Sequence, residues 1–463
     1  METLVTPARE VPILAQADVA VVGAGLGGVC ASVAAARAGA RTVLVERNAF
    51  PGGVATAGLM CSVTNYLVTR TGQVVVGGLA SEFLEGLVAE GGAMPDYART
   101  GQPQIPNDPE ATKRVLIGLL AEAGVTTLYG SLLSQALVDG EQVRAIVCEA
   151  KGGPFALTGA QFVDASGDLD LFRLAGARHE RVGSFSTLLF RMANVDIGAL
   201  VDWLEAHLES YDETADVGTS LQDTVRNWRE YGVFHLPHYA GQRIPMVADA
   251  IASGDLPARF GHHAQDLWAM GMYACRAKPG TVLVNSCAFA GDDLDVRHKS
   301  ECEAEGRLLV RVLADFLVAR FPGFADAYLL DTATEIGSRR TGRLCGLHTL
   351  TADEYRSGQA FPDAIGRTTE IDHTSPDRRR YAQAGQIPLR CLVSERPVNV
   401  ICGSGKSAST DPCGLLRGQV GCMVVGQGAG TAAALAAAEG IPVAQVDPER
   451  LRAHLAVAGV SLA

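Results

Sequence analysis

The stretch ADVAVVGAGLGGVCASVAAARAGARTVLVE, residues 17–46, determines the predicted fold. It begins with an apolar run rich in β-branched residues, 17–22, which predicts a buried parallel strand. The fingerprint G-x-G-x-x-G follows at once in residues 23–28, and the alanine-rich segment that ends near Gly39 predicts a helix. A second apolar strand then ends in Glu46. The stretch therefore predicts a strand–helix–strand unit of the dinucleotide-binding type.

The glycines of the fingerprint have separate functions in such a unit. Gly23 allows the tight turn, Gly25 lets the backbone approach a pyrophosphate, and Gly28 lets the helix pack close to the strand. The N–H groups and partial positive charge of the helix N-terminus favour a diphosphate at this turn. Glu46 is expected to accept hydrogen bonds from the adenosine ribose, and its charge disfavours NADP. A tight turn without a ligand is the alternative for this segment taken alone.

The composition is that of an acidic globular chain. With 463 residues it exceeds the ~250–300 residues over which one core grows, so we expect two domains. The formal net charge of −12 disfavours nucleic acid as a partner. No segment reaches the ~20 apolar residues that span a bilayer, so we expect no membrane contact. The eleven cysteines have no C-x-x-C or zinc spacing, which predicts reduced thiols, a cytoplasmic location and no metal site.

The residues after Glu46 favour FAD over NAD. Arg47 is followed by PGGVATAG, residues 51–58, in which a glycine pair and small residues suit a chain that passes along an extended cofactor. At this point the sequence resembles the large family of FAD-dependent oxidoreductases related to the fumarate-reductase and glutathione-reductase flavoproteins.

The resemblance continues through the first half of the chain. NDPE, residues 107–110, leads to a predicted helix at about 111–123 and a strand at 124–129, where the family reads the adenine near Val125. Alternating residues at about 132–163 predict a hairpin meander. The following FVDASGD, which ends at Asp168, is similar to the strand end that the family places beside FAD, with Ser166 in place of threonine.

The C-terminal part resembles the family in two further segments. VNVICGSGK, residues 398–406, is similar to a strand that leads to a Gly-Arg pair, with Lys406 in place of arginine. GQGAG, residues 426–430, is expected to open a long helix through about Glu439. In the family, the N-terminus of this helix points at the flavin, where its partial positive charge stabilises the reduced ring.

The resemblance implies an α/β fold in which a Rossmann-like FAD-binding domain of the glutathione-reductase type, with a β-meander, is interleaved with an α+β substrate domain. We expect the FAD-binding domain in residues 1–177 and 331–463, and a substrate-binding insert with its following helix in residues 178–330. The residues assigned to FAD are Gly23, Ala24, Gly25, Leu26, Gly27, Gly28, Glu46, Arg47, Gly52, Gly53, Thr56, Val125, Ala165, Ser166, Gly167, Asp168, Gly405, Gly428 and Ala429.

Three residues are candidates for catalysis. Arg339 lies in an arginine-rich segment of the family and could pair with a substrate carboxylate or stabilise an enolate, or instead form a structural ion pair between domains. His373 could move a proton near the flavin, although a loop histidine is more often a simple hydrogen-bonding residue. Lys406 stands where the family has arginine.

The leading hypothesis is an FAD-dependent oxidase or dehydrogenase that oxidises a small organic molecule by hydride transfer to flavin N5. Oxygen or an external acceptor would reoxidise the flavin, because a single dinucleotide fingerprint argues against an internal NAD(P)H site. A monooxygenase or halogenase is the alternative within enzymes, and a non-catalytic flavin-binding redox sensor is the alternative outside them. The substrate and a homo-oligomeric state stay open.

Overall fold

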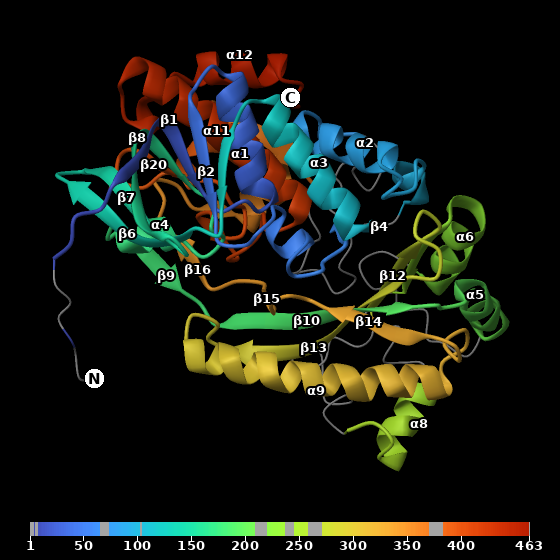
Figure 1. Cartoon of the computed structure of the whole chain (residues 1–463). Coiled ribbons are helices and arrows are strands. Elements are labelled where there is room, and N and C mark those ends of the chain that lie inside the picture. The colour runs from blue at the N-terminus through green and yellow to red at the C-terminus, as the bar shows by residue number, and fades with distance from the viewer. Residues whose placement is uncertain are drawn as a thin grey trace.

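The computed structural model describes residues 4, 8–64, 74–101, 104–208, 220–236, 245–257, 271–369 and 383–462. Two parts lie against one another in Figure 1, each with its own large sheet. The fold is a mixed α/β fold with a parallel-strand sheet, as the sequence predicts.

The first sheet has seven strands. Its order is β5-β2-β1-β8-β7-β6, and β20 pairs with β8. The strands are β1 (Ile13–Val22), β2 (Thr42–Glu46), β5 (Thr126–Tyr129), β6 (Leu132–Asp139), β7 (Gln142–Ala150), β8 (Gly153–Asp164) and β20 (Val400–Cys402). Strands β5, β2, β1, β8 and β20 are parallel, whereas β6, β7 and β8 form an antiparallel meander. The predicted strands and meander are confirmed.

Two adjacent helices pack against this sheet. They are α1 (Leu26–Arg37), which follows β1 directly, and α11 (Gln419–Glu439), the long C-terminal helix. Helices α2 (Leu79–Ala89) and α3 (Pro109–Glu122) pack outside them. The Asp108 side chain caps α3 by accepting a hydrogen bond from the Ala111 N–H at 3.2 Å, which explains why the predicted helix begins here.

The second sheet is antiparallel and holds the order β11-β12-β13-β10-β14, with β15 pairing with β10. Its strands are β10 (Ser184–Ala193), β11 (Val233–Leu236), β12 (Gly271–Cys275), β13 (Val282–Gly291), β14 (Tyr328–Thr332) and β15 (Gly337–Ser338). Helix α9 (Val296–Arg320) covers one face, with buried residues at helical spacing, and the other face looks toward the first part (Figure 1). The helix expected to follow the substrate-binding insert is present.

Shorter elements connect and flank the two sheets. They are η1 (Gly53–Ala55), β3 (Ser62–Thr64), η2 (Tyr97–Thr100), β4 (Gln104–Pro106), α4 (Asp170–Leu174), β9 (His179–Arg181), α5 (Ile197–Ala206), α6 (Leu221–Tyr231), α8 (Pro245–Ser253), β16 (Gly342–Leu344), β17 (Leu350–Thr351), α10 (Ala352–Ser357), β18 (Ala364–Thr368), β19 (Gly385–Pro388), η5 (Leu389–Cys391), β21 (Thr410–Asp411), η6 (Val443–Gln445) and α12 (Pro448–Val457).

The buried apolar residues form two clusters. One draws on residues 17–177 and 344–462, and the other on residues 188–336 together with Leu59 and Cys61. The chain thus leaves the first core, builds the second and returns to the first. Interleaved domains require such a path, while the boundaries at 177/178 and 330/331 stay a prediction.

Helix α11 corrects two expectations. It begins at Gln419 instead of near Gly426, so the glycine-rich segment lies inside the helix. By length and composition it could also cross a membrane, contrary to the expectation that no segment approaches this length. However, 89% of its most apolar window is buried inside the protein, as in the core helix of a globular fold.

Candidate functional site

A large cavity lies between the carboxyl ends of the parallel strands and the second sheet. Its empty space is about 2160 Å³ when the open solvent at its mouth is included. The ends of β1, β2 and β8 and the segment after β20 all reach it, at Val22, Glu46, Ala165 and Ser404. The cavity is therefore bounded by residues from both parts of the molecule.

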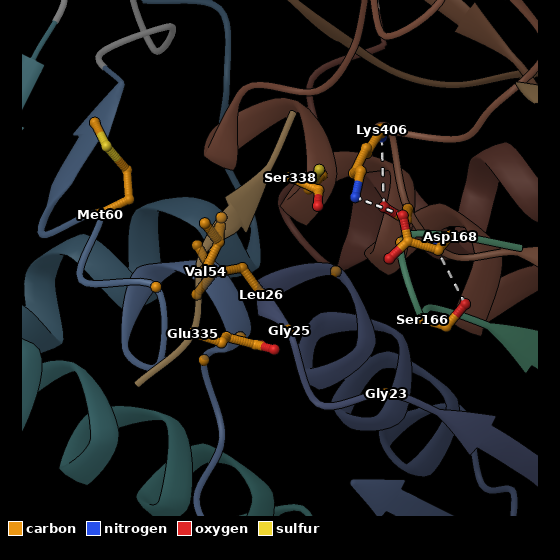
Figure 2. A pocket seen from close by; sticks show the side chains of 18 of the residues that line it. Gly23, Gly25, Leu26, Val54, Met60, Ser166, Asp168, Glu335, Ser338 and Lys406 are labelled. Carbon is orange, nitrogen blue, oxygen red and sulfur yellow. Dashed lines mark hydrogen bonds and ion pairs between the residues drawn. The ribbon is translucent and has the colours of Figure 1, made fainter. Parts of the chain in front are cut away.

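The fingerprint turn forms one wall of the cavity (Figure 2). Gly23 has a φ of +94°, and a Cβ there would lie 2.7 Å from the Ala165 carbonyl oxygen. A Cβ on Gly28 would lie 1.8 Å from the Gly23 carbonyl oxygen, so this glycine serves helix–strand packing, as predicted. At Gly25, by contrast, a Cβ would meet nothing within 4 Å, and the open space adjoins the N-terminus of α1. This cradle fits a pyrophosphate group.

Glu46 stabilises the fingerprint turn through a hydrogen bond and also lines the cavity. Its Oε2 accepts a hydrogen bond from the Ala24 N–H at 2.6 Å, and its Oε1 accepts one from the Asn48 N–H at 2.8 Å. A carboxylate has about four acceptor positions, so hydroxyl groups of a ribose can still donate to it. Ala24 does not line the cavity and acts through this bond to Glu46.

The glycine pair after Glu46 lies against the turn. The Gly52 N–H donates to the Ala24 carbonyl oxygen at 2.7 Å, and a Cβ on Gly53 would lie 3.1 Å from the Gly25 Cα. Both glycines line the cavity. Thr56 does not; its hydroxyl donates to the Pro51 carbonyl oxygen at 2.8 Å and holds this loop in shape.

An ion pair between two residues that are distant in the sequence forms a further part of the lining. The Lys406 Nζ lies 2.7 Å from the Asp168 Oδ1, and Figure 2 shows the two side chains pointing at one another. The Thr341 hydroxyl also donates to Asp168. Burial raises the pKa of Asp168, but the charge of Lys406 and these hydrogen bonds outweigh it and hold the pKa below its usual value. Asp168 is therefore ionised, and the pair is neutral as a whole.

Residues from both parts also meet at the rim. Arg47 forms an ion pair with Glu335, and the Lys299 Nζ lies 3.5 Å from the same carboxylate. Arg339 lines the cavity nearby, with its guanidinium 5.5 Å from the Phe185 ring centroid. The site thus holds several paired charges beside an anion-binding turn.

A family model described as FAD dependent oxidoreductase matches residues 18–455. The chain belongs to the FAD-dependent oxidoreductase family. FAD is its cofactor, and the open cradle at Gly25 and the carboxylate of Glu46, both on the cavity wall, fit this cofactor. No curated protein sequence matches the chain.

Several solved structures resemble this flavoprotein over most of its length. A geranylgeranyl bacteriochlorophyll reductase-like protein from Thermoplasma acidophilum has 13% identity and a TM-score of 0.45, covering 96% of this chain and 83% of that one. A flavoprotein/dehydrogenase from Cytophaga hutchinsonii has 14% identity and a TM-score of 0.45, covering 94% of this chain and 82% of that one. The p-nitrophenol 4-monooxygenase of Pseudomonas putida has 12% identity and a TM-score of 0.43, covering 95% of this chain and 88% of that one. With TM-scores below 0.5, none of these likenesses bears on the activity of this flavoprotein.

Most residues assigned to FAD lie on the cavity wall. They are Gly23, Gly25, Leu26, Gly27, Glu46, Arg47, Gly52, Gly53, Ala165, Ser166, Gly167 and Asp168, together with the catalytic candidates Lys406 and Arg339. Ala24, Gly28 and Thr56 support this wall from behind. His373 lies outside the described residues.

Besides Ala24, Gly28 and Thr56, four assigned residues do not line the cavity, and their assignment to FAD stays a prediction. Gly428 and Ala429 are buried in the middle of α11, where a Cβ on Gly428 would lie 2.5 Å from the Ile365 side chain. Gly405 is needed for packing, since its Cβ would lie 2.1 Å from the Leu416 carbonyl oxygen. Val125 packs half-buried against the first core.

Residues at neighbouring positions line the cavity instead. Instead of the segment near Gly428, the cavity meets the true start of α11, at Arg417, Gly418 and Gln419. Instead of Val125, it meets the start of β6, at Leu132 and Leu133. A helix-breaking Gly418 after a proline-containing loop was the available signal for the first, while Leu132 and Leu133 look like any other strand residues.

Sequence reasoning also missed the wall that the second sheet contributes. This sheet wall consists of Thr187, Leu189, His235, Tyr273 and Asn285, from strands β10 to β13. These residues are distant in the chain and have no common motif. Only the antiparallel pairing of the strands brings them together.

Proposed function

We propose that this flavoprotein is an oxidase or dehydrogenase that oxidises a small organic molecule. The observation that carries the proposal is the continuity of one cavity from the pyrophosphate cradle at Gly25 to the sheet wall. A small molecule on the sheet wall would lie beside the cofactor. FAD, when bound, would supply the acceptor for a hydride from a substrate carbon; the substrate would also release one proton, and oxygen or an external acceptor would take up the two electrons.

The chain's own residues would orient the cofactor and stabilise negative charge in the cavity. Glu46 and the start of α1 bind the adenosine and diphosphate part, and the Asp168–Lys406 pair adds hydrogen-bonding groups without net charge. Arg417 precedes Gly418, the N-cap of α11, so a guanidinium and the positive end of a helix face the cavity together. Both stabilise negative charge there. The eleven free cysteines fit the proposal of a cytoplasmic location.

The visible spectrum of the purified protein tests the proposal. It should be recorded before and after anaerobic incubation with amines, amino acids, alcohols and unsaturated acids. Bleaching of the flavin bands by one class supports the proposal and names that class. Flavin that no compound bleaches but that NAD(P)H reduces would support a monooxygenase or halogenase instead, and flavin reduced by neither would support a redox sensor.

Arg339 and its neighbour Arg340 form a matched pair for testing the catalytic candidates. Arg339 lines the cavity, whereas Arg340 is exposed and its Nε donates to the Gly183 carbonyl oxygen at 3.2 Å. Arg339→Met should slow anaerobic flavin reduction about tenfold or more, equivalent to ~1.4 kcal/mol in the barrier, while FAD stays bound. Stopped-flow absorbance measures this rate. Equal rates for Arg339→Met and Arg340→Met would rule out a catalytic role for Arg339.

A further inference from the structure

The sheet wall is a continuous row of side chains that face the cavity. Leu189 pairs with Asn285 across β10 and β13, Asn285 pairs with Gly271 on β12, and Tyr273 pairs with His235 across β12 and β11. Paired residues face the same side of a sheet, and so do residues two apart on one strand, such as Gly271 and Tyr273. The register therefore explains why residues from four strands share one surface.

His235 is the unusual member of this row. Its side chain is fully buried, and neither ring nitrogen has a hydrogen-bond partner among the described residues. Its ring stacks on Tyr273 with centroids 5.0 Å apart, and the Thr224 hydroxyl donates to its carbonyl oxygen at 2.6 Å. Burial lowers the pKa of His235 to about 3, so its ring is neutral near pH 7 and offers one donor and one acceptor.

Two unpaired nitrogens in a buried wall need a physical reason. A buried polar group without a partner costs roughly 1–3 kcal/mol, and phenylalanine would fill a similar volume without this cost. The position is held in place by stacking and by its backbone, so the ring is presented in one orientation. A ligand group that donates or accepts a hydrogen bond would remove the cost.

The sheet wall also disfavours charged groups of a ligand. None of its five residues carries a permanent charge, and the charged residues of the lining come from the cofactor loops, the start of α9 and the segment 335–339. A carboxylate or ammonium group placed against this wall would lose its hydration without gaining a counter-ion. An uncharged polar group loses much less.

We propose that His235 binds the substrate by a hydrogen bond to an uncharged hydroxyl or carbonyl group, so that the substrates are neutral alcohols, phenols or ketones. This inference rests on the proposed function, since it names the substrate class of the same cavity. His235 lines the cavity together with its stacking partner Tyr273.

Ligand binding to the oxidised holoenzyme tests the inference without turnover. Alcohols, phenols and ketones are titrated anaerobically against carboxylates and amines on the same carbon skeletons, for example benzyl alcohol, benzoate and benzylamine. Binding is followed by perturbation of the flavin bands. We expect the neutral members to bind at least tenfold more tightly. Tighter binding of carboxylates would assign recognition to Arg339 or Arg417, and the absence of any neutral ligand would equally overturn the inference.

Variants of His235 complete the test. His235→Phe keeps the ring and its stacking on Tyr273 but removes both nitrogens, so it should weaken neutral ligands at least tenfold while FAD binding and Tm are unchanged or Tm rises. His235→Gln, which restores a donor and an acceptor, should recover part of the affinity. Unchanged ligand affinity in His235→Phe, or a lower Tm without loss of affinity, would show a structural role only. Neutral ligands that bind but never bleach the flavin would leave this inference standing and contradict the proposed function.

Discussion

Asp164, which directly precedes the cavity-lining Ala165, shows how strongly the pKa of one residue depends on its surroundings. It lies at the end of β8 with 1% of its surface exposed. Its carboxylate accepts hydrogen bonds from the Ser166 hydroxyl at 2.6 Å and the Phe172 N–H at 3.0 Å. Burial and the nearby charge of Asp170 nevertheless raise its pKa to about 6.

This carboxyl group should make the unfolding free energy depend on pH. Because its folded-state pKa lies above the ordinary 3.8, the folded protein holds the proton more tightly than the unfolded chain. Its stabilising contribution is thus greatest below about pH 4, falls as the pH rises to about 6 and stays constant above, a change of about 3 kcal/mol. Urea denaturation at saturating FAD should show Asp164→Asn gaining stability relative to wild type over this window. A difference independent of pH would contradict the assignment.

At the scale of elements, the contact between α1 and α11 shows that the residues inside one helix depend on the helix that packs against it. A Cβ on Gly426 would lie 2.0 Å from the Gly27 carbonyl oxygen, and one on Gly430 would lie 2.0 Å from the Ala31 carbonyl oxygen. Glycines inside α11 weaken its intrinsic helical preference, but they allow two backbones to touch. The sequence pattern GQGAG therefore marks a helix crossing in this protein, and the helix starts seven residues earlier, at Gln419.

Two glycine-to-alanine substitutions separate packing from propensity. Gly430→Ala should destabilise the protein by about 1–3 kcal/mol, because the new methyl group meets backbone atoms of α1 that have no room to move. Gly118→Ala is the control, since Gly118 lies inside α3 with nothing within 4 Å of its Cβ position. It should stabilise the protein by up to ~1 kcal/mol. Urea denaturation midpoints compare the two, and a neutral Gly430→Ala would disprove the close helix contact.

At the scale of the whole molecule, the cavity joins the two cores. Its lining draws on the first sheet and its loops, and on the sheet wall whose strands belong to the second core. The ion pair between Arg47 and Glu335 links residues 288 positions apart across the rim. A ligand bound in this cavity should therefore stabilise both cores.

Removal of FAD should lower the stability of both parts together. At a free FAD concentration of 100 times Kd, the cofactor contributes ~2.7 kcal/mol, so the apoprotein should unfold at a lower Tm. Hydrogen exchange of the apoprotein and holoenzyme should show protection gained in β1 and α1 and also in β10 and β13. Protection confined to β1 and α1 would mean that the second core does not sense the cofactor.

The local parts of this fold were predictable from the sequence alone. The β1–α1–β2 unit, the meander and α9 each follow from patterns within a few residues, because apolar periodicity and glycine positions act over short distances. The same holds for Gly23, Gly25 and Glu46, whose spacing is set by one turn and one helix. These features identified the cofactor.

The remaining features depend on contacts between distant segments. The glycines expected to open α11 instead lie inside it and pack against α1, while the helix begins at Gln419. Lys406 meets Asp168 only through the pairing of β20 with β8, and His235 meets the cavity only through the register of four strands. No pattern within a short window encodes such pairings. The sequence therefore determined the cofactor-binding unit, and the tertiary structure alone decided which side chains of the second sheet face the cavity.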